Sequence, residues 1–182
     1  MLSIEGDILL FVQEHLRNDI CDPIFKAITH LGDAGIFWII LTAVLLCFKK
    51  TRKAGICSAI ALIGSVIVNN LILKNLIGRV RPYEVVDGLV CLVAHAHDAS
   101  FPSGHTGASF ASAVAMYKNL PKKYAILLII LASLIAFSRV YIGIHYPTDI
   151  LGGLATGIGL GILANVIYDK VSAKFAAKKA EE

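Results

Sequence analysis

The most restrictive feature of the sequence is a run of twenty residues, Ala54–Leu73, without a charged side chain. A helix of this length spans the roughly 30 Å hydrocarbon core of a bilayer. Further apolar runs occupy Ala34–Phe48, Tyr124–Ile144 and Ile150–Tyr168. Hydrophobic residues make up 57% of the chain and charged residues only 16%, compared with about 45–50% and about 25% in soluble domains. We therefore expect an all-α, polytopic membrane helix bundle.

Two segments favour close packing between membrane helices. Pro102–Tyr117 is rich in Gly, Ala and Ser, and Ile150–Tyr168 contains five glycines. Small residues let the backbones of neighbouring helices approach each other within a membrane. We therefore expect Pro102–Tyr117 to be a further span, which brings the number of expected spans to five.

The start of the chain is less apolar than the rest. Residues 1–33 place hydrophobic side chains at helical spacing, but a span there would bury Arg17, Asp19 and Asp22, which is costly. We interpret this segment as an amphipathic helix at the membrane interface. The expected architecture is one membrane-embedded domain, 1–182, of five or six transmembrane helices, with 1–33 interfacial and 169–182 a basic, frayed cytoplasmic tail.

Basic side chains gather in three short clusters between the apolar runs. They are Lys49, Lys50, Arg52 and Lys53; Lys118, Lys122 and Lys123; and Lys170, Lys174, Lys178 and Lys179. Membrane topology explains these positions better than contact with nucleic acid, because Lys and Arg are enriched in cytoplasmic loops. With five spans, all three clusters fall on one side. The loop Asn75–Ser100 then faces the outside of the cell membrane, and we expect no nucleic-acid partner.

Three polar clusters interrupt the apolar pattern. They are KNLIGRVRP from Lys74 to Pro82, PSGH from Pro102 to His105, and Ser138, Arg139, His145 and Asp149. In the predicted topology each lies at the outer end of a span, so that all three can form one site. Lys74, Arg81 and Arg139 bring three cations to that site. Arg suits bidentate contact with phosphate oxygens, and Lys supplies a point charge.

The PSGH segment adds a second feature that favours anion binding. A helix that starts near Pro102 leaves backbone N–H groups free to point at an anion. Ser103 adds a hydroxyl group, and Gly104 lets the backbone approach a ligand closely. The combination of these groups with three cations predicts a phosphate site.

Two histidines in these clusters point to chemistry on the phosphate. Asp149 follows His145 by four residues, and Pro147 is well placed to begin the last helix. Asp149 could then reach back and orient the imidazole, as a carboxylate does in a catalytic triad. His145 is therefore the candidate nucleophile. His105 has no nearby carboxylate in the sequence and is the candidate general acid.

These clusters resemble the three-part signature of the type 2 phosphatidic acid phosphatase superfamily, and every element of that signature is matched between Lys74 and Asp149. The resemblance implies a helical membrane bundle that hydrolyses a phosphate ester or anhydride without a metal or other cofactor. It implies a phosphohistidine on His145, which Asp149 orients, and a proton from His105 to the leaving group. The phosphate-binding positions are Lys74, Arg81, Ser103, Gly104 and Arg139.

The resemblance leaves the substrate more open than the reaction. The small size and outward-facing site are similar to bacterial undecaprenyl-diphosphate phosphatases, which favours undecaprenyl diphosphate and a role in cell-wall biogenesis. Phosphatidylglycerophosphate and phosphatidic acid are the alternative substrates. A lipid binder or transporter without catalysis is a further hypothesis, because glycine-rich spans with charged residues also suit it.

Two groups of residues near the motifs have no assigned role. His95, His97 and Asp98 lie close together in the outer loop and could bind a metal, although a solvated loop is the simpler interpretation. Arg79 lies two residues before Arg81 and could contact a second phosphate or only the lipid headgroups.

Overall fold

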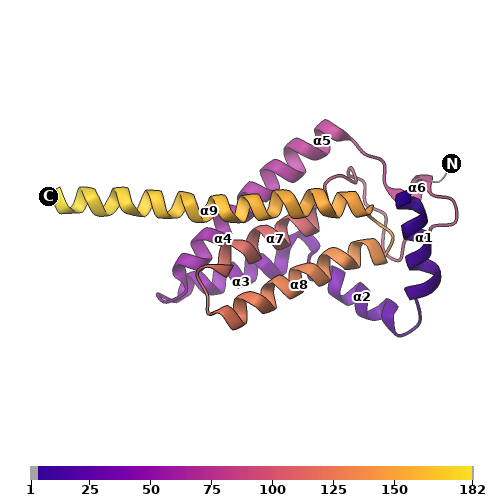
Figure 1. Cartoon of the computed structure of the whole chain (residues 1–182), viewed down its shortest axis with the longest axis horizontal. Coiled ribbons are helices and arrows are strands. Elements are labelled where there is room, and N and C mark those ends of the chain that lie inside the picture. The colour runs from indigo at the N-terminus through magenta and orange to yellow at the C-terminus, as the bar shows by residue number, and fades with distance from the viewer. Residues whose placement is uncertain (1–3, 182) are drawn as a thin grey trace.

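The structure, a computed structural model, describes residues 4–181, and every regular element in that range is helical. The elements are α1 (Ile4–Leu16), α2 (Cys21–His30), η1 (Asp33–Gly35), α3 (Ile36–Cys47), α4 (Arg52–Ser65), η2 (Val66–Leu73), α5 (Lys74–Ile77), α6 (Pro82–Val85), α7 (Gly104–Tyr117), α8 (Lys122–Tyr141) and α9 (Pro147–Glu181). The predicted all-α class is confirmed. α9 is the longest helix and extends well beyond the bundle (Figure 1).

Helix α7 forms the centre of the bundle. It contacts α4, α8 and α9 over much of its length, and nine of its fourteen residues are buried. Trp38 of α3 is fully buried in a cluster with Phe110 and Ile135, and its indole Nε1 donates to Ser109 Oγ at 2.9 Å. The small side chains of α7 thus allow neighbouring helices to approach on several sides.

The closest approach is between α7 and α9. Gly153, Gly157 and Gly161 recur every four residues on α9 and therefore share one face. A Cβ atom at Gly157 would lie 2.7 Å from the carbonyl oxygen of Gly107, and one at Gly153 would lie 2.6 Å from that of Ser103. The expected close packing of the glycine-rich run is confirmed, and this contact fixes the PSGH segment against the start of α9.

The three basic clusters gather at the end of the bundle opposite α1, α2 and α6 (Figure 1). Asp169 of α9 contacts two of them: its Oδ1 lies 2.7 Å from Lys53 Nζ, and its Oδ2 lies 3.7 Å from Lys118 Nζ. The third cluster continues along α9. The chain beyond Asp169 remains helical to Glu181, so the expectation of a frayed tail was wrong for the described residues.

Among the described residues, three helical stretches are long and apolar enough to cross a membrane: Arg52–Val85, Lys122–Tyr141 and Pro147–Lys178. The bent pair Cys21–His30 and Asp33–Cys47 would make a fourth. The chain is therefore a multi-pass membrane protein. Five or six spans remain a prediction, because α3 has only 12 residues and α7 only 14, too few to cross a bilayer by length alone.

The N-terminal helices cover one end of the bundle. α1 runs across the direction of α9 (Figure 1) and packs Leu9 and Val12 inward while Ile8 and Phe11 remain exposed. α2 lies against α8. The division into an interfacial segment and a membrane domain stays a prediction.

Candidate active site

The fold brings the three polar clusters together at the end of the bundle that α1 and α2 cover. Lys74 begins α5, Arg81 precedes α6, and Ser103 is the N-cap of α7. The third cluster surrounds the turn between α8 and α9. Arg139 lies in the last turn of α8, His145 in the connection, and Asp149 in the first turn of α9.

His145 and Asp149 form a buried pair, with 1% and 0% of their surface exposed. Nδ1 of His145 lies 3.2 Å from Asp149 Oδ2, as the four-residue spacing predicted. The same carboxylate accepts hydrogen bonds from Ser100 Oγ and the backbone N–H of Tyr146. A carboxylate acceptor places the imidazole proton on Nδ1 and leaves the lone pair on Nε2. Burial lowers the pKa of His145 to about 3, with the hydrogen bond to Asp149 acting in the opposite direction, so the ring is neutral at pH 7.

Arg81 connects this pair to Asp98 and Lys74. Its Nη1 lies 3.3 Å from His145 Nε2 and also donates to the carbonyl oxygen of Ile144. Its Nη2 donates to Asp98 Oδ1 at 2.5 Å, and the other oxygen of that carboxylate accepts from Lys74 Nζ. Burial raises the pKa of Asp98, but the hydrogen bond and charge of Lys74 and the charge of Arg81 outweigh it and lower the pKa to about 2. An anion therefore lies between the two cations next to the imidazole.

Arg139 is buried and incompletely paired. Its Nη1 donates to Thr29 Oγ1 at 2.7 Å, whereas its Nε has no hydrogen-bond partner among the described residues. A buried donor without a partner is unfavourable unless another group satisfies it. An anion that binds at this end of the bundle would supply that group.

Ser103 and Gly104 lie at the N-terminus of α7. The Ser103 side chain caps the helix, so it is not free to bind an anion. The Ser103 hydroxyl is buried, accepts from Thr106 and caps the helix. Gly104 faces α5: a Cβ atom there would lie 2.9 Å from Asn70 Oδ1 and 3.7 Å from Lys74 Nζ. The absence of a side chain at Gly104 thus leaves room beside Lys74.

His105 has a partner that the sequence analysis missed. Its Nε2 lies 2.9 Å from Asp33 Oδ1, across 72 residues of sequence. His105 has no carboxylate close to it in the sequence, as stated above, but the fold brings Asp33 into contact with its ring. The only sequence signal was the Gly-Asp-Ala-Gly segment before an apolar run, which is typical of a turn.

Arg79 is a further residue of this region, and the sequence left its role open. Its Nη1 donates to Asp149 Oδ1 at 2.7 Å and to Thr148 Oγ1, and its Nη2 donates to Glu5 Oε2. Its guanidinium also lies 3.8 Å from the ring centroid of Tyr146. Arg79 therefore faces the back of the His145–Asp149 pair in this structure, rather than an open phosphate site.

The loop histidines do not join the site. The ring of His95 stacks on Tyr83 with centroids 4.2 Å apart, and His97 is exposed. Asp98 is engaged by Lys74 and Arg81. Within residues 4–181, no three His, Cys, Asp or Glu side chains are arranged to hold a metal ion.

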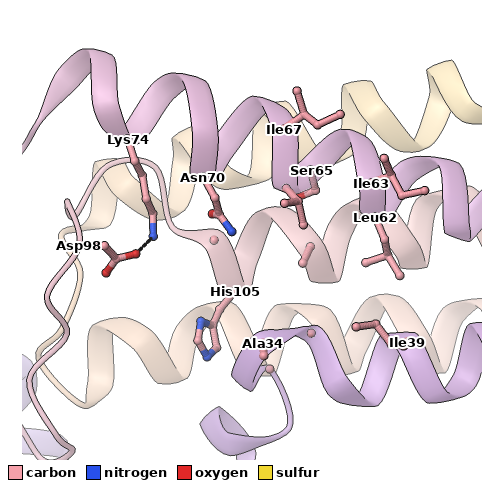
Figure 2. Close-up of a pocket in the computed structure, with 15 residues that line it drawn as sticks. Ala34, Ile39, Leu62, Ile63, Ser65, Ile67, Asn70, Lys74, Asp98 and His105 are labelled. Carbon is pink, nitrogen blue, oxygen red and sulfur yellow. Dashed lines mark hydrogen bonds and ion pairs between the residues drawn. The ribbon is translucent and has the colours of Figure 1, made fainter.

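A cavity of about 470 Å³ adjoins the site and extends along α3, α4 and η2. Figure 2 shows Lys74, Asp98, Asn70 and His105 around its polar end. Apolar side chains line the rest, between α3, α4 and η2. They are Ile39, Leu62, Ile63, Val66 and Ile67. A molecule with an anionic head and a hydrocarbon chain fits this division between a polar and an apolar part.

Residues 54–173 match the PAP2 superfamily, that is, the type 2 phosphatidic acid phosphatases whose signature the three clusters resemble. The chain belongs to the PAP2 superfamily. This match covers all three clusters and confirms the resemblance.

Several members of the PAP2 superfamily show the likeness in detail. The Bacillus subtilis undecaprenyl-diphosphatase BcrC is 35% identical over 148 residues, which are 81% of this chain and 75% of that protein. An undecaprenyl-diphosphatase from Sulfolobus acidocaldarius is 36% identical over 127 residues, 70% of this chain, but the match spans only 61% of the relative's length. The crystal structure of a PAP2-type phosphatidylglycerolphosphate phosphatase from Bacillus subtilis superposes with a TM-score of 0.76 at 29% identity, covering 92% and 85% of the two chains.

Proposed function

We propose that this protein is a membrane phosphatase that removes a terminal phosphate from a lipid through a phosphohistidine on His145. The observation that carries the proposal is the placement of the buried His145 imidazole. Its Nδ1 is held by Asp149 and its Nε2 faces Arg81, next to an anion held by two cations. Membership of the PAP2 superfamily supports it. A substrate phosphate would displace the Asp98 carboxylate and bind Lys74 and Arg81 in its place.

The reaction has two halves. In the first, Nε2 of His145 bonds to phosphorus as the bond from phosphorus to the leaving oxygen breaks, and His105 gives that oxygen a proton. In the second, a water oxygen bonds to phosphorus as the P–N bond breaks, and His105 takes a proton from the water. Arg139 and the N–H groups at the start of α7 join Lys74 and Arg81 in holding the phosphoryl oxygens, with Ser103 and Gly104 shaping that helix start.

The hydrocarbon part of the substrate would occupy the cavity between α3, α4 and η2. His105 lies at the junction of its polar and apolar parts, where the oxygen that joins phosphate to lipid would lie. Its position therefore suits a general acid acting on the leaving group.

Undecaprenyl diphosphate is the substrate that we rank first. Two relatives with 35% and 36% identity are named undecaprenyl-diphosphatases, and a diphosphate suits a site with several cations. Phosphatidylglycerophosphate is the alternative that the structural relative supports, and phosphatidic acid is the third.

The proposed topology has five spans: α3, α4 with η2 and α5, α7, α8, and α9. The basic clusters around Asp169 mark the cytoplasmic side of the cell membrane. The site at the opposite end then faces outward, and α1 lies at the outer interface.

One assay tests this function: purified protein in detergent is given the three lipids in matched mixed micelles, with excess EDTA. We expect phosphate release that survives chelation, because the cationic side chains supply the charge stabilisation, and the highest kcat/KM for undecaprenyl diphosphate. Loss of turnover that one divalent ion restores would contradict the metal-free mechanism. A preference for another lipid would change the substrate but not the chemistry.

A non-catalytic lipid binder or transporter predicts a different result. His145→Ala would leave lipid affinity intact in either case. If the protein is a phosphatase, the wild-type chain hydrolyses the lipid and His145→Ala abolishes this turnover. If it is a binder or transporter, neither form hydrolyses the lipid.

A further inference from the structure

Asp33 bridges two histidine rings at the edge of the site. Its Oδ1 lies 2.9 Å from Nε2 of His105, and its Oδ2 lies 2.7 Å from Nδ1 of His30. Both carboxylate oxygens are therefore engaged, and the carboxylate cannot turn away from His105 without losing a second contact. The His30 side chain is 62% exposed and that of Asp33 48%, whereas 19% of the His105 side chain is exposed.

The turn that carries Asp33 has an unusual backbone. Ala34 and Gly35 adopt φ angles of 49° and 69°, and this left-handed conformation is unfavourable for Ala. Such strain persists where the surrounding structure holds it, often near functional sites. Gly32 in the same turn packs on the His105 ring, since a Cβ atom there would lie 2.6 Å from its Cδ2. The turn thus fixes the ring on two sides.

This contact determines which ring nitrogen of His105 is available. Nε2 is occupied by Asp33, whereas Nδ1 has no hydrogen-bond partner in the described part of the chain. Figure 2 shows a ring nitrogen turned toward Lys74 and Asp98, at the polar end of the cavity. The charged groups around the ring are Asp33 from η1, Lys74 from α5, Asp98 from the loop and Arg139 from α8. Asp33 is the anion that hydrogen bonds to it.

We propose that Asp33 is a positioning residue for His105, and this inference rests on the proposed function. Asp33 holds the ring with Nδ1 toward the leaving oxygen and stabilises the imidazolium, next to the two cations, until its proton is transferred. Nδ1 gives its proton to the leaving oxygen as the P–O bond breaks. It takes a proton from the attacking water in the second half of the reaction, so that the ring returns to its starting state.

The test compares leaving groups. An alkyl or lipid phosphate needs a proton on its leaving oxygen, whereas an aryl phosphate such as p-nitrophenyl phosphate leaves as a weak base. We expect Asp33→Asn to lower kcat/KM, which reports the first half of the reaction, about 10- to 100-fold for the lipid phosphate, within the range of general acid catalysis, and less than about threefold for the aryl phosphate. Asp33→Glu should restore part of the loss.

The matched control is Asp19→Asn, which removes an exposed carboxylate from the same N-terminal region and should leave both rates unchanged. In a His105→Ala background, Asp33→Asn should have no further effect, because its partner is gone.

Equal losses for the two substrates, or an undiminished loss in that background, would overturn the inference. If Asp33→Asn does not fold, Asp33→Glu carries the same comparison, with a smaller selective loss. An inactive wild-type protein would instead contradict the proposed function.

Discussion

Asp98 binds the two cations that a substrate phosphate would need. Its carboxylate contacts Lys74 and Arg81, yet 54% of its side chain is exposed. With its pKa lowered to about 2, Asp98 stays charged across the physiological pH range, so a change of pH does not free the cations. A phosphate that took the place of Asp98 on both cations, as proposed, would therefore have to displace this anion.

We expect Asp98→Asn to strengthen phosphate binding. An amide competes less well than a carboxylate for Lys74 and Arg81, and loss of one charged hydrogen bond corresponds to roughly tenfold in affinity, about 1.4 kcal/mol. The inhibition constant of inorganic phosphate should fall by about that factor. Asp87→Asn, in the same loop, removes a carboxylate that makes no ion pair within the described residues and should leave the constant unchanged. An increase for Asp98→Asn would show that Asp98 organises the cations rather than competing for them.

Arg79 contacts the carboxylate that holds His145, the proposed nucleophile. It binds the oxygen of Asp149 that His145 does not use. Arg79→Met should free that carboxylate to turn, and misplacing a catalytic group by about 1 Å costs on the order of 100-fold in rate. We expect kcat to fall about 10- to 100-fold, with little change in KM. Arg52→Met, at the opposite end of the bundle, is the control. A large rise in KM with unchanged kcat would instead assign Arg79 to substrate binding.

At the scale of the helices, the contact between α7 and α9 determines how well the site is assembled. Gly157 leaves no room for a side chain, whereas a Cβ atom at Gly159, two residues along the same helix, would meet no atom within 4 Å. Gly157→Ala should therefore destabilise the protein by about 1–3 kcal/mol, the usual cost of overpacking. Gly159→Ala should be neutral or stabilise it by up to about 1 kcal/mol, because Ala favours helix.

Thermal unfolding in detergent, followed through the single tryptophan, Trp38, distinguishes the two variants. Trp38 packs against α7 and donates to Ser109, so its fluorescence reports on that helix. Equal midpoints for Gly157→Ala and Gly159→Ala would contradict the proposed role of the glycine face.

The sequence predicted the local parts of this architecture well. Pro147 begins α9 and places Asp149 one turn from His145, because both features depend on short-range helix geometry. The uncharged run from Ala54 forms α4 but continues into a π-helix, Val66–Leu73. Apolar composition sets helix length and does not reveal that change of hydrogen-bond pattern.

The pairings that the sequence could not reveal are all long-range. Asp33 and His105 are 72 residues apart, and Glu5 and Arg79 are 74 apart. Neither Asp33 nor Glu5 belongs to a motif, and their partners depend on how α1 and η1 fold over the end of the bundle. Periodicity along one helix contains no information on such contacts.

For the whole molecule, the separation of charge along the bundle relates the fold to the proposed function. Lys74 and Arg81, the proposed phosphate-binding cations, lie at one end and pair with Asp98. At the opposite end Lys53 and Lys118 share Asp169 as their one ion-pair partner within the described residues, and the other basic residues of the three clusters add an excess of positive charge there. Such an excess marks a cytoplasmic surface.

Cysteine labelling tests the resulting orientation, because both ends of the bundle offer exposed positions. Lys50 and Lys122 lie at the basic end, and Asp87 and His97 lie in the loop near the site. After the four native cysteines are replaced, single cysteines at these positions are treated with a membrane-impermeant maleimide on intact cells. We expect labelling at positions 87 and 97, and labelling at 50 and 122 only after the cells are opened. The reverse pattern would place the site on the cytoplasmic side, where it would meet phosphatidylglycerophosphate and not a diphosphate lipid released outside.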